Sequence, residues 1–263
     1  MTGQEIRKLL EQVGQRLAQE PGLIHLQGSE VVFVGDTHGD FEATQLVIER
    51  HPPKEATLVF LGDYVDRGPK SSENLNFLLQ LKLDYPDKLF LLMGNHEGRK
   101  ALRFYPADFW ESLEPELHEL YAETLSHLPL AAVAPNGVIA LHGALPDVPE
   151  LEDIGQIKLG TDQWYQITWG DWQEEEGEIL EKDAFTGRPQ FGQGWFEKLM
   201  ARFGKQVLIR SHQPGAPQLM YGGRCLTIFT SSAYRLYVPQ RTIALADLER
   251  GVKTAADLTI EVI

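Results

Sequence analysis

Residues 31–39 read VVFVGDTHG, four consecutive apolar residues that end abruptly at Gly35, Asp36 and His38. A short run of β-branched and aromatic residues without polar alternation is typical of a strand that is buried on both faces. Asp36 and His38 stand two positions apart in an extended segment, so their side chains project to the same side. Gly35 and Gly39 allow a tight turn at this point. A carboxylate and an imidazole placed in this way can bind one divalent metal ion.

The same pattern recurs five more times along the chain, each time as a short strand-like run that stops at polar residues. The runs occupy residues 58–61, 89–93, 138–141, 207–209 and 226–229. The first four of them are followed by Asp63, by Asn95 and His96, by His142 and by His212. Helical patterns over 41–51 and 71–85 separate the early runs, and this alternation predicts βαβ units with a mainly parallel sheet. Because ligands bind outside the carboxyl ends of such strands, we expect these polar side chains to meet.

Four of the eight histidines fall in these terminal turns, namely His38, His96, His142 and His212. Isolated structural histidines would need four separate explanations for that placement. The pooled side chains offer oxygen and nitrogen ligands but no sulfur, which favours Mn, Fe or Zn over copper. Two ions ~3.5–4 Å apart that share ligands would form the kind of site that supports in-line displacement at phosphorus. The other four histidines are expected to face solvent: His25, His51, His118 and His127.

Composition limits the class of protein. With 24 basic and 38 acidic side chains, the 263-residue chain carries a net charge of −14, which repels nucleic acids and anionic membranes. The single cysteine, Cys225, excludes an intramolecular disulfide and a thiolate zinc cluster. No stretch has the apolar length of a signal peptide or a membrane span. We therefore expect a cytoplasmic monomer with one domain over residues 1–263 and neither nucleic-acid nor membrane partners.

Three further segments carry weaker patterns. Residues 106–128 have apolar side chains at helical spacing, which predicts one helix there. Residues 164–190 are acidic and rich in glycine, which indicates a long loop or a small β element. Residues 242–263 alternate between apolar and polar side chains, which predicts a hairpin at a sheet edge.

Five sequence blocks together resemble the PPP family of protein serine/threonine phosphatases, within the calcineurin-like metallophosphoesterases. The blocks are GDTHG at 35–39, GDYVDRG at 62–68, GNHE at 94–97, HG at 142–143 and RSHQ at 210–213. Their order and approximate spacing agree with the family, and the matching region extends to Tyr234. The resemblance implies an α/β fold with a central β-sandwich flanked by helices. The sequence departs from the usual family pattern at Ala144 and Ser232–Tyr234, and these departures favour a compact member of prokaryotic type.

The resemblance also implies a function for each residue of the blocks. It implies two divalent ions, Mn²⁺ in vitro and Fe or Zn natively, of which one is bound by Asp36, His38 and Asp63 and the other by Asp63, Asn95, His142 and His212. A hydroxide that bridges both ions would attack the phosphorus of phosphoserine or phosphothreonine directly. His96 would protonate the leaving alkoxide, and Asp66 would orient His96. Arg67, Arg188 and Tyr234 would bind the phosphate, whereas Arg210 would be structural.

Several alternatives remain open at this level. A symmetrical dinucleoside-tetraphosphate hydrolase shares the fold and metals, and Gly68-Pro69 is similar to its sequence, but Asp66-Arg67 and Glu97 differ from its usual pattern. Activity on phosphotyrosine is a variant of the main prediction. A non-catalytic scaffold of the same fold would have lost ligands, whereas every expected position is filled here. Asp171 could be structural or could contact a metal-bound water.

The acidic run Glu174–Glu176, with Glu178 and Glu181, has two interpretations. It is most simply a solvated loop. Alternatively, it lies at the rim of the cleft and favours basic peptides over polyanions.

Overall fold

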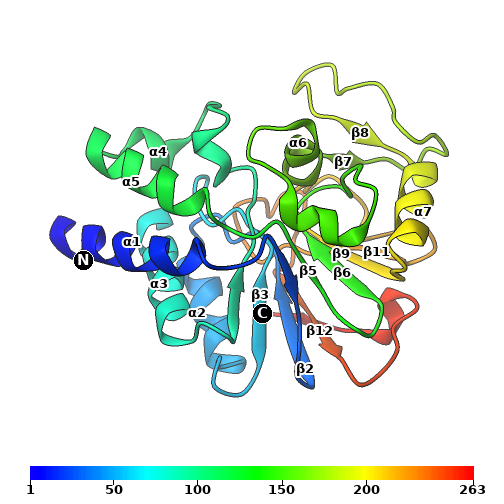
Figure 1. Ribbon diagram of the computed structural model, residues 1–263, viewed down its shortest axis with the longest axis horizontal. Coiled ribbons are helices and arrows are strands. Elements are labelled where there is room, and N and C mark those ends of the chain that lie inside the picture. Colours follow the sequence, from blue (N-terminus) through cyan, green and yellow to red (C-terminus); the bar gives the residue numbers. More distant parts are fainter.

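The computed structural model describes residues 1–263, and two β-sheets packed face to face form its centre (Figure 1). The first sheet contains, in spatial order, β13 (Thr259–Val262), β12 (Thr242–Asp247), β2 (Glu30–Val34), β3 (Thr57–Phe60) and β4 (Leu89–Leu91). The second contains β1 (Leu23–His25), β5 (Ala131–Val133), β6 (Val138–Leu141), β9 (Val207–Arg210), β11 (Cys225–Thr227) and β10 (Leu219–Met220). A separate pair joins β7 (Asp171–Trp172) to β8 (Gln190–Phe191).

The strand directions agree in part with the mainly parallel sheet that the sequence predicts. β2, β3 and β4 are parallel neighbours, and so are β6, β9 and β11, so the carboxyl ends of each set lie at one edge of its sheet. The hairpin expected over residues 242–263 exists as the antiparallel pair β12–β13. However, β12 also pairs with β2, so of the two strands of the hairpin only β13 lies at the sheet edge.

The central strands are buried on both faces, as their continuous apolar sequences predict. In β2, Val31 and Phe33 belong to a core of 20 buried residues that both sheets contribute to. Val32 and Val34 alternate with them and join the larger core of 49 residues beneath the helices. Alanines supply several positions of the inter-sheet core, among them Ala132, Ala140 and Ala244. Such side chains suit a place where two sheets face each other closely.

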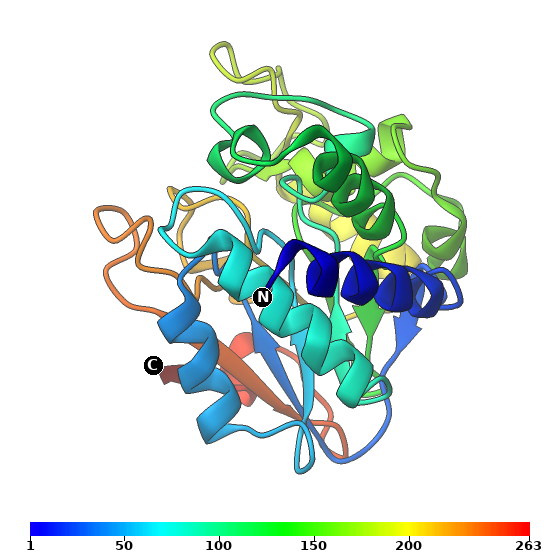
Figure 2. The same ribbon diagram turned by 90° about the vertical axis from the view of Figure 1, so that its left-hand side faces the viewer.

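Helices cover the outer faces of both sheets (Figures 1 and 2). One group contains α1 (Gly3–Leu17), α2 (Phe41–Arg50), α3 (Ser71–Asp84), α4 (Asp108–Glu111) and α5 (Pro115–Leu125). The other contains α6 (Asp162–Trp169) and α7 (Gln193–Arg202). Short 3₁₀ turns occupy Gly98–Lys100, Leu151–Gln156 and Ala255–Asp257. None of these helices combines the length and the apolar surface that a bilayer crossing requires.

Three expectations need correction. Residues 106–128 form two helices, because Pro115 starts α5 and cannot continue α4. The segment over residues 164–190 contains the expected small β element, β7–β8, but α6 enters it, and Thr161 caps this helix by accepting from the Trp164 N–H at 3.3 Å. His51 and His118 are only partly exposed, because His51 contacts Glu261 and His118 packs on an indole ring. His25 and His127 are exposed, as expected.

A buried lysine connects α3 to the segment that follows α1. Lys82 of α3 has no exposed side-chain surface, and its Nζ donates to the carbonyls of Pro86 and Leu89 at 2.8 Å each. The same ammonium group pairs with Glu20, whose side chain is 7% exposed and follows α1. Removing one member of a buried ion pair leaves the other charge without compensation.

We expect Lys82→Met to lower the free energy of unfolding by about 3 kcal/mol, because Glu20 and two carbonyls lose their donor. Chemical denaturation monitored by circular dichroism measures this change. The exposed Lys88 gives a matched control, and Lys88→Met should change the value by less than about 0.5 kcal/mol. Equal effects of the two substitutions would contradict the assigned role of the pair.

Candidate active site

The polar residues that follow the parallel strands meet around Asp63, which follows β3. Its Oδ2 atom lies 3.5 Å from His38 Nε2, 3.5 Å from His142 Nε2 and 3.8 Å from His96 Nε2. These histidines follow β2, β6 and β4, so strands of both sheets contribute to one cluster. The expected convergence of the strand ends is therefore observed, with a carboxylate at its centre.

Two groups of potential metal ligands share this carboxylate. The atoms of His38, Asp63 and His96 lie within 4.8 Å of one another, and so do those of Asp63, His142 and His212. Asp36 lies beside the first group, with its Oδ2 atom 3.7 Å from His38 Nε2. The structure thus brings Asp36 and His38 together with Asp63, as predicted, and adds His96 next to them.

Asn95 and His212 both lie beside His142 of the second group. Asn95 Oδ1 lies 3.2 Å from His142 Nε2, and the ring of His212 lies 4.9 Å from that of His142. Asp171 is buried nearby, with its Oδ1 atom 3.4 Å from His212 Nε2. Asp171 thus lies between His212 of the second group and Arg188, whose Nη1 atom is 3.8 Å from the same oxygen.

Several buried atoms in this cluster have no hydrogen-bond partner in the protein. They are Asp36 Oδ2, Asp171 Oδ1 and both ring nitrogens of His212. Buried polar groups are normally paired, so a concentration of unpaired ligand atoms indicates a place for a cation. Burial and the nearby Arg188 charge lower the pKa of His212 well below its usual value, so its imidazole is neutral, the form that binds metals. The donor set therefore fits divalent metal ions.

The loops that carry these side chains hold unusual backbone conformations. Only six non-glycine residues of the chain have positive φ, and five of them belong to the cluster. They are His38 at 41°, Asp63 at 54°, Asp66 at 65°, and Arg67 and His212 at 71° each. Such conformations cost free energy for residues with a Cβ and persist where the surrounding structure enforces them. The strain is therefore concentrated at the candidate site.

Two glycines allow the strand ends to approach each other. Gly62 has a φ of 110°, and a Cβ there would collide with the backbone of Gly94. A Cβ at Gly94 would in turn collide with the carboxylate of Asp63. The glycines that begin these two sequence blocks thus allow the loops of Asp63 and Asn95 to lie close together.

His96 and Asp66 form a hydrogen-bonded pair beside the metal ligands. His96 Nδ1 lies 2.6 Å from Asp66 Oδ2, and the other oxygen of Asp66 accepts from the Phe109 N–H at 2.8 Å. Trp110 Nε1 donates to the His96 carbonyl at 3.0 Å, and the Phe104 ring meets the imidazole edge-on at 4.7 Å. The imidazole is therefore fixed with its Nε2 atom turned towards the cluster.

A pocket of about 330 Å³ opens beside this pair. Its lining residues are Arg67, Asn95, His96, Phe104, Tyr105, Trp169, Phe185, Thr186 and Arg188. Arg188 stacks on the indole of Trp169, with its guanidinium carbon 5.6 Å from the ring centre. Both predicted phosphate-binding arginines thus line one pocket with His96, and two guanidinium groups there suit an anion.

Tyr234 lies at the edge of the same site. Its ring is 5.3 Å from that of His38. Burial raises the pKa of its hydroxyl, while the nearby positive charge of Arg67 acts in the opposite direction. The hydroxyl therefore stays protonated and can donate to an anion held by Arg67.

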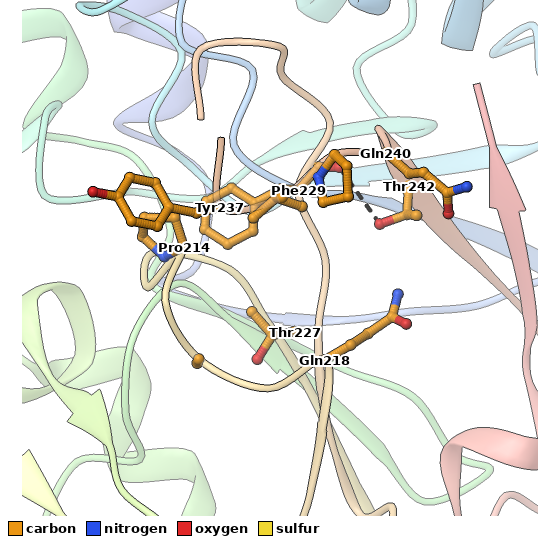
Figure 3. A pocket seen from close by; sticks show the side chains of 10 residues that line it. Pro214, Gln218, Thr227, Phe229, Tyr237, Gln240 and Thr242 are labelled. Carbon is orange, nitrogen blue, oxygen red and sulfur yellow. Dashed lines mark hydrogen bonds between the residues drawn. The ribbon is translucent and has the colours of Figure 1, made fainter. Parts of the chain in front are cut away.

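A second pocket, of about 230 Å³, is lined in part by the segment from Tyr237 to Gln240 (Figure 3). Its lining includes Phe229, Tyr237, Gln218 and Gln240, and no charged residue contributes to it. Without a cation it cannot compensate the charge of a phosphate group. Of these two pockets, only the one beside His96 offers positive charge to an anion.

Glu97 is a functional residue that the sequence interpretation did not single out. Its Oε2 atom accepts from the N–H groups of Asp63 at 2.8 Å and Gly94 at 3.1 Å, and its Oε1 atom accepts from that of Tyr64 at 2.9 Å. Burial, together with the charge of Asp63, raises the pKa of Glu97 to about 8. Glu97 thus fixes the loop that presents Asp63. The sequence did contain one indication of this role, since Glu97 lies inside the GNHE block that begins with Gly94.

Arg210 and the acidic run contact backbone groups. Arg210 is buried and donates to the carbonyls of Gly143 and Gly170, which agrees with a structural role.

In the acidic run, the carbonyls of Glu175 and Glu176 accept from the first N–H groups of α7 at 2.6 and 3.0 Å. The run therefore holds the start of α7, where negative charge is favourable.

Comparisons with known proteins agree with this arrangement. Residues 29–216 match the profile of the family described as calcineurin-like phosphoesterase. A probable serine/threonine-protein phosphatase of Encephalitozoon cuniculi is 28% identical over 245 residues, which are 87% of this chain and 53% of that protein. Human serine/threonine-protein phosphatase 5 is 30% identical over 243 residues, which are 86% of this chain and 48% of that protein. The chain thus spans about half the length of these curated relatives.

A solved structure is similar to the whole chain. A protein serine/threonine phosphatase from Saccharomyces cerevisiae, with similarity to human phosphatase PP5, superposes with a TM-score of 0.82 at 23% identity. The match covers 100% of this chain and 90% of that one. The expected calcineurin-like fold, with sheets flanked by helices, is therefore confirmed, and so is the resemblance stated from the sequence blocks.

We expect Glu97→Gln to weaken Mn²⁺ binding about tenfold, as changes behind metal ligands commonly do. The substituted amide must turn its NH₂ group towards at least one N–H donor of the loop, which shifts Asp63. Isothermal titration calorimetry of the metal-stripped protein measures the affinity. The exposed Glu114 supplies the control, and Glu114→Gln should bind Mn²⁺ like the unmodified protein. Unchanged affinity in the Glu97 variant would refute the positioning role.

Proposed function

Since this chain belongs to the calcineurin-like phosphoesterase family, we propose that it is a metal-dependent phosphatase that hydrolyses phosphoserine and phosphothreonine monoesters in proteins. The observation that carries this proposal is the His96–Asp66 pair, joined at 2.6 Å, in a pocket that two arginines line. The names of the relatives support the substrate class. No comparable support favours the dinucleoside-tetraphosphate alternative.

The family implies divalent metal ions, and the ligand atoms described above fit them. Asp36, His38 and Asp63 would hold one ion, and Asp63, Asn95, His142 and His212 would hold the other. When bound, such ions polarise the phosphoryl group and lower the pKa of a water nucleophile. We propose Mn²⁺ as the ion that supports activity in vitro, with Fe or Zn as the native ions.

His96 would act as the general acid for the leaving alkoxide. Its Nδ1–H donates to Asp66, so the transferable proton resides on Nε2, the nitrogen that faces the cluster. The buried carboxylate of Asp66 stabilises the protonated imidazole and keeps its orientation. Once the proton has left Nε2, the imidazole is neutral and still hydrogen-bonded through Nδ1. Asp66 is therefore a positioning residue.

The remaining residues would bind and enclose the phosphate. Arg67 and Arg188 compensate its negative charge, and the Tyr234 hydroxyl adds a donor beside Arg67. Phe104 and Trp169, whose rings lie 5.1 Å apart, form an apolar wall that limits access of bulk water. Electrostatic interactions with the transferred group become stronger when water is excluded.

Phosphate release by the metal-stripped protein, with and without added Mn²⁺, tests the proposal. Phosphoserine, phosphothreonine and phosphotyrosine peptides and diadenosine tetraphosphate serve as parallel substrates. We expect Mn²⁺-dependent release from the phosphoserine and phosphothreonine peptides. Release of nucleoside diphosphate from the dinucleotide, with inert peptides, would replace the proposal by the alternative.

We expect His96→Ala to reduce kcat on phosphoserine peptides by about 10²–10⁴-fold, the usual contribution of a general acid. The loss on p-nitrophenyl phosphate should be smaller, because its leaving group needs no protonation. Metal content, measured by plasma mass spectrometry, should stay unchanged, and the exposed His127→Ala variant should behave like the unmodified protein. Equal losses on both substrates, or loss of metal, would contradict the assignment.

A further inference from the structure

Two aromatic side chains project into solvent at the mouth of the catalytic pocket. Tyr105 is 69% exposed and Phe185 is 99% exposed, although both line the pocket that contains His96. Exposing large apolar groups to water is unfavourable, and such groups next to a functional site commonly mark a contact surface. A bound substrate that covers them would gain the free energy of their burial.

The turn that carries Phe185 is held by hydrogen bonds. Asp183 Oδ1 accepts from the N–H of Phe185 at 3.1 Å and from the N–H and hydroxyl of Thr186 at 2.7 and 2.8 Å. The Asp183 carbonyl accepts from Gly187 at 2.8 Å, and its N–H donates to the carbonyl of Arg188 at 3.0 Å. Phe185 is thus presented by a turn that ends at a phosphate-binding arginine.

Tyr105 is connected in a similar way to the other arginine. Arg67 Nη1 donates to the carbonyl of Pro106, the next residue, at 2.9 Å. The guanidinium group of Arg99 lies 5.3 Å from the centre of the Tyr105 ring and supports its inner face. Each arginine of the pocket is therefore linked to one exposed aromatic side chain: Arg188 ends the turn that carries Phe185, and Arg67 donates to the residue after Tyr105.

The geometry of an extended peptide sets which substrate residue can reach this surface. When the phosphorylated side chain points into the pocket, its immediate neighbours point away, and residues two positions away point to the same side. Those residues stand about 7 Å along the chain from the phosphorylated one. They are the side chains that meet the rim of the pocket.

We propose that Phe185 and Tyr105 bind a large apolar side chain located two positions from the phosphorylated residue, so that the enzyme selects phosphopeptides with that pattern. This proposal rests on the proposed phosphatase function and adds a sequence preference to it. The contact is apolar, so the preference should persist at high ionic strength, unlike a preference for basic peptides.

Steady-state kinetics on matched phosphoserine peptides test this preference. The peptides carry leucine or serine at position −2, −1, +1 or +2 relative to phosphoserine and are otherwise identical. We expect kcat/KM to be about tenfold higher for leucine at −2 or +2, the scale of burying an apolar side chain, and nearly equal for −1 and +1. Phe185→Ser should abolish the preference, and Phe185→Leu should restore most of it.

Ile179 provides the matched control, because it belongs to the same connection between β7 and β8 and is 65% exposed but does not line the pocket. Ile179→Ser should keep the preference. A preference that survives in Phe185→Ser, or its absence in the unmodified protein while all peptides are hydrolysed, would overturn this inference alone. If Mn²⁺-loaded protein hydrolyses none of the phosphopeptides, the proposed function itself fails and takes this inference with it.

Discussion

The structure depends on keeping the carboxylate of Asp63 buried among imidazoles without losing its charge. Its side-chain oxygens face the backbone N–H of His96 and three imidazole Nε2 atoms, and its own N–H is held by the buried Glu97. A charge in such a place is stable only when opposite charge or hydrogen bonds compensate it. Bound cations would satisfy this requirement, and the surrounding glycines and strained turns have the geometry that brings the ligands close enough.

Much of this arrangement could be predicted from residue patterns. Apolar runs that stop at Asp36, Asp63 or His142 predicted both the strands and the edge at which they meet, because buried parallel strands leave few alternatives. Other features depend on contacts that no local pattern carries. Glu97 accepts from three N–H groups, two in the turn after β3 and one in the turn after β4. α6 is only 8 residues long, so its apolar spacing is hard to distinguish from that of a loop. The break before α5 was visible as Pro115 but was outweighed by the apolar spacing on either side.

Net charge and local charge act differently in this protein. The chain carries a net charge of −14, yet the pocket beside His96 is lined by Arg67 and Arg188 and by no carboxylate. Short-range interactions in a partly desolvated pocket exceed the screened field of distant surface charges. Part of the acidic excess is paired elsewhere, since Glu178, which follows the run Glu174–Glu176, forms a salt bridge with Lys198 of α7 at 2.6 Å. An acidic protein can therefore still receive a doubly charged anion.

The position of β12 has a consequence for how the chain acquires activity during synthesis. All the candidate metal ligands have been translated once His212 has been added, but β2 then still lacks its neighbour on one side, because β12 lies between β2 and β13. Asp36 and His38, which follow β2, are thus attached to a strand whose pairing is completed only by residues 243–247. The candidate site would therefore lack part of its support until β12 has folded onto β2, although all of its ligands precede β12 in the chain.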